Sequence, residues 1–270
     1  MTIQRSRPPV GSLSRRMFLG GSAALPVLWA EAVRAAGKPY AARIFSAGFD
    51  GAAYQGGLQL AMEPGWKTYW RVPGEGGIPP SLEVKGGNIG SFSFACPLPH
   101  RIASEGGEAI GYKDEVIFPW RLVPADDAKP VMASFSAFVG VCETVCIPVP
   151  LTQDLTLEPV GIATPDTALL SRWLARVPPE GKIVSGLSAG EASGIFIDMQ
   201  LSAPAQDIFV EGNAMHFFAA PVWAADRKSA RLAVHGAKSA GELRNQPLRI
   251  TVATGDGSPA GGLEQIVPVL

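Results

Sequence analysis

Cysteine and histidine are scarce in this chain of 270 residues, which contains only three of each. The histidines His100, His216 and His235 stand singly, and no second pair of Cys or His lies at ligand spacing. The sequence therefore lacks the usual pattern of a four-ligand zinc site. Gly74 to Gly77 are not followed by a Lys-Ser/Thr pair, and no Ser-His-Asp set or pair of carboxylates stands out. These absences argue against a phosphate loop and against the common hydrolase patterns.

Long apolar runs and a strong charge of one sign are also missing. After residue 35 no segment reaches the roughly 18 apolar residues that a spanning helix needs. The net charge of the chain is −1, and residues 1–35 carry five arginines and one glutamate, a net +4, which leaves −5 for the remainder. A mildly acidic surface argues against nucleic acid or an anionic membrane as a partner.

The first 35 residues predict an export signal. Arg15 and Arg16 precede a modestly apolar run over residues 17–32, which is interrupted by glycines, a proline and Glu31. Small residues at Val33 and Ala35 are suitably placed for cleavage. This pattern is typical of a twin-arginine signal peptide, and the short, interrupted run disfavours the alternative of a membrane anchor. We expect a soluble periplasmic protein that does not span the membrane once the signal is removed.

Turn-forming and strand-forming residues are what the chain has in plenty. Its 31 glycines and 24 prolines separate short runs rich in Val, Ile, Phe and Thr, the composition of an all-β protein. Between residues 40 and 158 these runs have the spacing of an antiparallel sandwich. The expected strands are Arg43–Phe49, Gly57–Glu63, Ser91–Ala95, Glu115–Val123, Val131–Val141 and Leu151–Glu158.

Residues 159–182 interrupt this pattern and are expected to form a helical linker. Thr164 is a suitable N-cap, Pro165 suits the first helical position, and apolar residues at helical spacing continue to Pro178. Beyond it, residues 183–270 are expected to form a second, smaller β domain. Its predicted strands are Gly194–Leu201, Asp207–Glu211, Met215–Phe218, Ala230–His235 and Leu248–Thr254.

Two of the three cysteines, Cys142 and Cys146, lie in the stretch VCETVCIP. Residues four apart on one continuous strand are about 13 Å apart, whereas a disulfide needs Cα atoms roughly 4.4–6.8 Å apart. The backbone between the two cysteines must therefore turn. Pro148 and Pro150 cannot donate ladder hydrogen bonds, so we expect the strand that leaves the turn to be an edge strand or a bulged one.

Three interpretations of the pair stay open on the residues alone. A structural disulfide would stabilise weakly, because closing about five residues contributes about 2 kcal/mol. A Cu(I) site could use both sulfurs together with a Met or Cys96, since Cu(I) prefers soft ligands. A redox pair is the third, although Glu143 lies between the cysteines and no Lys or Arg is adjacent in sequence, so nothing local favours the thiolate.

Three motifs resemble, in order, the N-terminal periplasmic region of DsbD-type thiol:disulfide interchange proteins, with the ScsB-like branch the most similar. They are GWKTYWRVPGEGGIPP (65–80), GYKDEV (111–116) and VCETVCIP (141–148). A weaker similarity to the companion β domain of that branch runs from Phe209 to Trp223. The resemblance covers the first β domain and implies an immunoglobulin-like fold for residues 40–158.

The resemblance also implies a function. Cys142 and Cys146 would be a catalytic redox pair, with Cys146 forming the mixed disulfide, and no metal or organic cofactor would be needed. Electrons would come from a membrane-embedded DsbD/CcdA-type transporter by way of a thioredoxin-like partner. They would then pass to periplasmic thiol proteins, as in a protein-disulfide reductase system. Residues 105–113 would correspond to a cap loop that shields the pair, with Tyr112 as the shielding aromatic. The alternative is a non-catalytic interaction or copper-handling protein.

Two further groups have plainer expectations. Cys96 has no place in the family pattern and is expected to be a small buried apolar residue. Of the aromatics Trp66, Tyr69 and Trp70, one or two are expected to face a sandwich core rather than to line a binding groove.

Overall fold

The computed structural model describes residues 37–270, apart from 75, 105–106, 162–163, 256 and 259. The predicted signal peptide, residues 1–35, lies outside the described residues and stays a prediction. No helix in the described part of the chain has the length and apolar character needed to cross a membrane.

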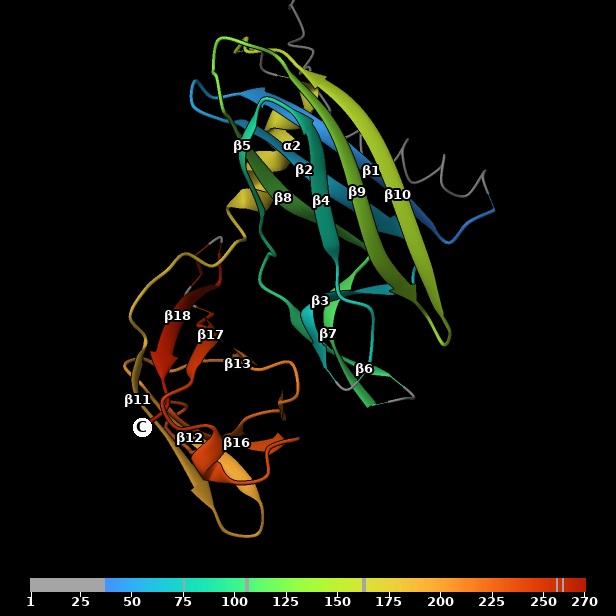
Figure 1. Ribbon diagram of the computed structural model, residues 1–270. Coiled ribbons are helices and arrows are strands. Elements are labelled where there is room, and N and C mark those ends of the chain that lie inside the picture. Colours follow the sequence, from blue (N-terminus) through green and yellow to red (C-terminus); the bar gives the residue numbers. More distant parts are fainter. Residues whose placement is uncertain (1–36, 75, 105–106, 162–163, 256, 259) are drawn as a thin grey trace, which may run out of the picture. The chain divides into compact units, whose positions relative to one another are not determined.

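Two antiparallel sheets make up the region from Tyr40 to Leu157 (Figure 1). One has the strand order β1-β2-β8-β5, and the other has the order β10-β9-β3-β7-β6, with β4 also paired to β9. The all-β prediction is confirmed, and the arrangement is consistent with an immunoglobulin-like sandwich. The strands are β1 (Tyr40–Phe49), β2 (Tyr54–Met62), β3 (Lys67–Gly74), β4 (Ser81–Gly87), β5 (Ile89–Phe94), β6 (His100–Ser104), β7 (Gly107–Lys113), β8 (Glu115–Pro124), β9 (Val131–Cys142) and β10 (Cys146–Leu157).

Strand β9 shows how the sequence pattern makes this sandwich. Val131, Ala133, Phe135, Ala137 and Val139 are buried, while the residues between them are exposed. This alternation places one face of the strand against a core that also contains Trp70, Trp120 and Phe118. Burial of these large side chains is the main force that holds the two sheets together.

Strand β10 lies at the end of its sheet, next to β9. The two strands pair without a register shift from Cys146 opposite Cys142 to Leu157 opposite Val131. Pro148 and Pro150 lie within this ladder, opposite Gly140 and Phe138. The expectation of an edge strand is therefore confirmed, and no bulge accompanies the prolines.

The predicted helix forms over Pro165–Leu174 and is labelled α2. The backbone N–H of Thr164 donates to the hydroxyl of Thr167, which satisfies a donor at the start of the helix. Leu170 and Trp173 are buried in the core of the first region, and Arg43 of β1 forms an ion pair with Asp166. The helix therefore packs against the sheet of β1, β2 and β8.

Residues 183–270 contain two further antiparallel sheets, with strand orders β11-β12-β16-β14 and β13-β17-β18; β15 also pairs with β16. They enclose a second core around Ile197, Met199, Leu232 and Ile250. The strands and the short 3-10 helix are β11 (Val184–Glu191), β12 (Ile195–Leu201), β13 (Asp207–Glu211), β14 (Phe217–Phe218), β15 (Val222–Trp223), β16 (Ser229–His235), η1 (Ala240–Glu242), β17 (Pro247–Ala253) and β18 (Gly262–Pro268).

Residues from these later strands contact the first region, and Lys38–Leu270 form one compact unit. Phe209 of β13 packs edge-on against Trp70 of β3, with ring centroids 5.7 Å apart. The guanidinium of Arg71 contacts the carboxylates of Glu211 and Glu264. The division into two domains at residues 159–182 thus stays a prediction, since the two cores are distinct but joined by these contacts.

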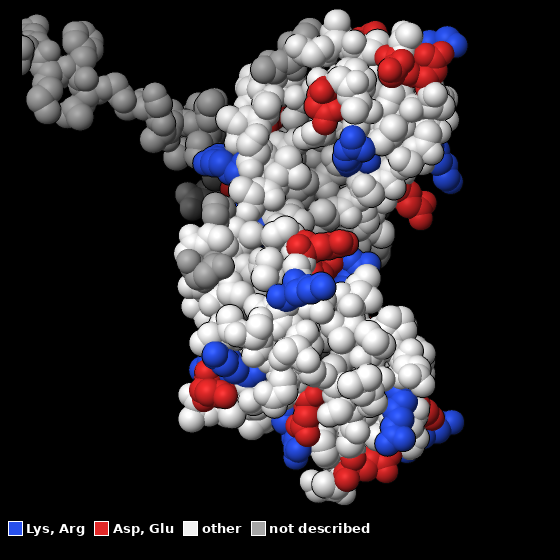
Figure 2. Space-filling view, turned by 90° about the vertical axis from the view of Figure 1, so that its left-hand side faces the viewer, with Lys and Arg blue, Asp and Glu red and all other residues white. Residues whose placement is uncertain are grey.

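Arg101 of β6 makes a second set of contacts between the regions. Its guanidinium lies 3.0 Å from Asp207 and 2.6 Å from Glu108 of β7 and donates to the backbone carbonyl of Ile208. On the face shown in Figure 2, acidic and basic side chains lie interspersed among wide uncharged areas. Ion pairs such as those of Arg101 contribute little to the free energy of unfolding, so their main effect is to position the strands that carry them.

Candidate functional site

Cys142 and Cys146 form a disulfide at the tip of the β9–β10 hairpin. Cys142 is the last residue of β9, Cys146 is the first of β10, and their Cα atoms are 4.1 Å apart. Only Glu143, Thr144 and Val145 separate the strands, so the backbone turns as the disulfide geometry requires. The sequence prediction of a turn between the cysteines is confirmed.

The two cysteine residues differ in their access to solvent. Cys142 is 1% exposed, whereas Cys146 is exposed, and Val145 beside it is 73% exposed. Exchange with another thiol requires in-line approach to one sulfur of the disulfide, and access decides which one is attacked. The arrangement thus presents Cys146 to a partner and keeps Cys142 inside.

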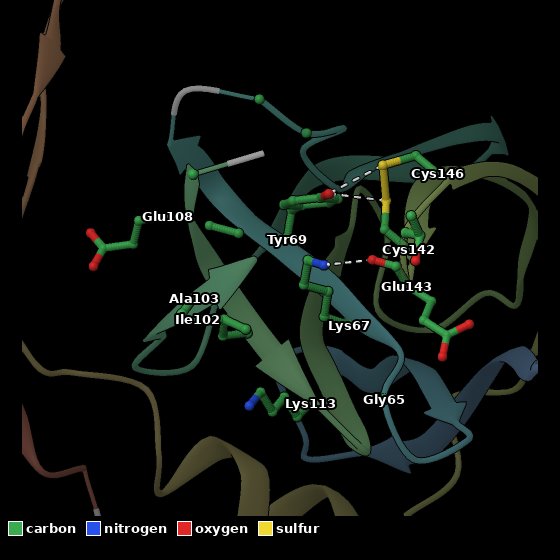
Figure 3. Close-up of a pocket in the computed structure, with 15 residues that line it drawn as sticks. Gly65, Lys67, Tyr69, Ile102, Ala103, Glu108, Lys113, Cys142, Glu143 and Cys146 are labelled. Carbon is green, nitrogen blue, oxygen red and sulfur yellow. Dashed lines mark hydrogen bonds between the residues drawn. A yellow bond between two sulfur atoms is a disulfide. The ribbon is translucent and has the colours of Figure 1, made fainter. Parts of the chain in front are cut away.

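Strand β3 holds the buried side of the pair. Lys67 lies opposite Cys142 and Thr68 opposite Val141 in the β3–β9 pairing, and the hydroxyl of Thr68 donates to the carbonyl of Gly140 at 2.7 Å. These contacts place the side chain of Tyr69 at the sulfurs. Its hydroxyl donates to Cys142 Sγ at 2.9 Å and lies 3.2 Å from Cys146 Sγ (Figure 3).

Tyr69 is itself only 4% exposed, and this burial raises the pKa of its hydroxyl. The phenol is therefore a neutral hydrogen-bond donor over the ordinary pH range. Gly77 lies against its ring, with a φ of +143°, and a Cβ at this position would lie 2.4 Å from the ring. Glycine at position 77 thus allows the chain after β3 to fold closely over Tyr69. This packing gives a structural reason for a glycine in the stretch from Gly74 to Gly77, which does not have the context of a phosphate loop.

Lys67 supplies a cation that the sequence interpretation did not expect. Its ammonium donates to the carbonyl of Glu143 at 3.0 Å, and the residue is 7% exposed. The carboxylate of Glu143 points away from the sulfurs, toward Gly65 (Figure 3). A cation therefore lines the same cavity as both cysteines, and it comes from the neighbouring strand rather than from residues adjacent in sequence.

A cavity of about 460 Å³ lies beside the disulfide. One wall comes from the β6–β7 hairpin, where Ile102 and Ala109 form a small apolar cluster with Tyr69 and Cys142. Lys67, Lys113, Glu108 and Glu143 also line the cavity. A site of this size and mixed polarity can accept a few side chains of another protein.

The expected cap loop, residues 105–113, falls partly outside the described residues, because 105 and 106 are not among them. Gly107–Lys113 form β7 and contribute to the cavity wall. The structure places Tyr112 elsewhere: it is 4% exposed, its ring packs on Phe118, and its hydroxyl donates to the carbonyl of Pro97. Tyr69, which the sequence interpretation treated only as a family marker, is the tyrosine that contacts the pair.

Cys96 and the other aromatics lie where they were expected. Cys96 is a free thiol, 5% exposed, and burial raises its pKa to about 11. It is thus an unreactive thiol at neutral pH. Trp70 is 1% exposed in the sandwich core. Within the described residues no group of three or more His, Cys, Asp or Glu side chains lies together as metal ligands would.

Comparisons with known proteins bear on this site. Over residues 36–158 the sequence matches the family described as "Thiol:disulfide interchange protein DsbD, N-terminal". Among curated proteins, none matches the sequence. Among solved structures, the N-terminal periplasmic domain of ScsB from Proteus mirabilis is similar in fold, with a TM-score of 0.68 and 23% identity, over 85% of this chain and 93% of that one. Residues 36–158 are therefore similar in sequence to the DsbD N-terminal family, and the fold of the chain is similar to that of the ScsB N-terminal domain.

Proposed function

We propose that this protein is a periplasmic thiol:disulfide interchange protein that passes reducing equivalents through Cys142 and Cys146. The observation that carries this proposal is the unequal exposure of the two cysteine residues at an edge hairpin, with Cys146 exposed and Cys142 1% exposed. The match of residues 36–158 to the DsbD N-terminal family supports it. The twin-arginine signal would bring the folded protein to the periplasm.

The exchange has two steps. A thiolate of a reduced partner attacks Cys146 Sγ, a new bond forms between the partner's sulfur and Cys146, and the Cys142–Cys146 bond breaks with its electron pair on Cys142. The partner's second thiolate then attacks the partner's first sulfur, which is bonded to Cys146 in the mixed disulfide. A disulfide forms within the partner, and Cys146 is released as a thiolate. The partner ends as a disulfide, and this protein ends as a dithiol that has gained two electrons.

The reverse sequence, with an oxidised acceptor, passes these electrons on. Thioredoxin-like periplasmic proteins and a membrane-embedded transporter of the DsbD/CcdA type are the proposed partners. The structure of the pair favours exchange over a purely structural role, since the closed loop is small and the pair borders a cavity. A structural disulfide of a domain with this large a core would contribute little.

The proposal is tested first by the redox midpoint. The protein without residues 1–35 is equilibrated in a series of thiol/disulfide buffers, and its cysteines are then trapped by alkylation. A midpoint of roughly −160 to −270 mV fits exchange with periplasmic partners, whereas one below about −300 mV indicates a structural disulfide. Cys96→Ala is the matched control, since this buried thiol should leave the midpoint unchanged.

The second test is capture of partners in cells. Cys142→Ala should leave Cys146 joined to a partner in a mixed disulfide that reductant releases, because the resolving sulfur is gone. Cys146→Ala should capture far less, since Cys142 is buried. Capture of no thioredoxin-like protein by either variant would contradict the proposed function. Stoichiometric Cu(I) binding that is lost when both cysteines are replaced would favour the copper-handling alternative.

A further inference from the structure

The hydrogen bond from Tyr69 to the buried sulfur has a consequence for the bond-breaking step. In the disulfide, Tyr69 Oη lies 2.9 Å from Cys142 Sγ, the sulfur that receives the electron pair when Cys146 is attacked. Disulfide sulfur is a weak acceptor, but thiolate sulfur is a charged and much stronger one. The same contact thus becomes stronger as negative charge develops on Cys142.

Burial makes such a donor necessary. Cys142 is 1% exposed, so water cannot solvate its thiolate well, and an unpaired buried charge is costly. Tyr69 is 4% exposed and held against Gly77, so its hydroxyl already lies in place before the reaction. A donor that needs no reorganisation stabilises developing charge most effectively.

We propose that Tyr69 is a catalytic residue, whose hydroxyl donates to the thiolate that forms on Cys142 when a partner's sulfur takes over Cys146. This inference rests on the proposed exchange function and adds to it the group that makes Cys142 a good leaving group. The partner's sulfur bonds to Cys146, the Cys142–Cys146 bond breaks, the electron pair remains on Cys142, and the phenol keeps its proton while it donates.

Lys67 acts beside it as a positioning residue. Its ammonium is 7% exposed and fixes the turn through the carbonyl of Glu143, directly after Cys142. It lines the same cavity as the two sulfurs, and no ion pair between it and a carboxylate is present among the described residues. Lys113, Glu108 and Glu143 line this cavity as well, so replacing Lys67 removes one positive charge from a mixed set of charges beside the sulfurs, which disfavours the thiolate.

The decisive measurement is the pKa of the Cys142 thiol. In a Cys96→Ala, Cys146→Ala background, Cys142 is the remaining thiol, and its ionisation is followed by thiolate absorbance against pH. Adding Tyr69→Phe should raise this pKa by about one unit, roughly tenfold in the ionisation constant, since a hydrogen bond to a charged group contributes about that much. Lys67→Met should also raise it, and Lys67→Arg should restore it.

Tyr112→Phe is the matched control, because it removes a hydroxyl from an equally buried tyrosine that bonds Pro97 instead of the sulfurs. It should leave the pKa of Cys142 unchanged. In the protein with both redox cysteines, Tyr69→Phe should slow reduction by a small thiol several-fold relative to Tyr112→Phe, since a leaving group of higher pKa leaves more slowly. Equal values for the two variants would overturn the inference.

A second approach avoids substitution of the ring. Replacing all four tyrosines by 3-fluorotyrosine keeps their shape and makes each hydroxyl a stronger donor, so the pKa of Cys142 should fall. An unchanged value would count against the inference even if Tyr69→Phe did not fold. These measurements use no partner protein, so they give a result even if no partner is captured in cells. Failure of this inference can therefore be distinguished from failure of the proposed function.

Discussion

Reduction of the Cys142–Cys146 disulfide should cost the folded protein little stability. The bond closes a loop across a sequence separation of 4, for which the chain-entropy estimate is about 2 kcal/mol, against more than 4 kcal/mol for a loop of about 100 residues. The hairpin does not depend on the bond, because β9 and β10 pair from Cys142 and Cys146 to Val131 and Leu157. Reduction therefore lowers the free energy of unfolding mainly because it gives the unfolded chain more conformational freedom.

Urea unfolding of the oxidised and reduced protein measures this difference directly. For a chain of this size, about 2 kcal/mol corresponds to a fall in Tm of roughly 4–8 °C. The Cys142→Ala, Cys146→Ala double variant should match the reduced protein. By reciprocity of linked equilibria, the folded protein should hold its disulfide with a midpoint about 40 mV below that measured in urea.

A large effect would refute this reasoning. If reduction lowered the free energy of unfolding by more than about 4 kcal/mol, or abolished cooperative unfolding, the bond would hold native structure that the strand pairing does not. The pair would then be a structural disulfide, and the proposed exchange function would lose the support that it takes from the small size of the closed loop.

Three further predictions concern groups around the pair. Gly77→Ala should destabilise the fold by about 1–3 kcal/mol in urea unfolding, because the new Cβ would overlap the Tyr69 ring at a φ of +143°; an unchanged midpoint would contradict the close packing. Burial raises the pKa of Glu264, but its contacts with Arg71 and other donors lower it overall. The ionised Glu264 therefore contributes to the free energy of unfolding fully above pH 4.5, and this contribution is lost as the pH falls through the lowered pKa. Arg71→Met should therefore weaken the acid dependence of unfolding, and an identical pH profile would rule this out. Cys96 should resist alkylation in the native protein, given its burial and a pKa of about 11, and rapid labelling would show that the site opens.

Strands with a clear alternation could be predicted from the sequence, and others could not. The run Val131–Val141 identified β9 to within one residue, and the prolines after Cys146 indicated that β10 is an edge strand or a bulged one. Strand β3 was missed because Lys67 to Trp70 are all buried and show no alternation. Strands β6 and β7 contain few β-branched residues, so propensity gave no signal there.

Some residues of the candidate site could be predicted from the sequence, and others could not. The cysteines and the turn between them were predictable because spacing and disulfide geometry are local properties. Lys67 and Tyr69 lie more than seventy residues from their partners in sequence, at separations of 76 and 73. Only the pairing of β3 with β9 brings them together, and no local pattern encodes that pairing. Sequence position likewise does not reveal the partner of Tyr112, whose hydroxyl donates to the carbonyl of Pro97.

Neighbouring residues of β3 have different partners. Tyr69 contacts the sulfurs, Trp70 meets Phe209, and Arg71 is bound by Glu211 and Glu264. A rotation of this strand about its axis that withdrew the phenol from Cys142 would also disturb the contacts with β13 and β18. Residues 183–270 therefore restrain rotation of β3 beside the disulfide. Selection for the proposed electron transfer would then also act on side chains of β13 and β18 that no partner protein touches.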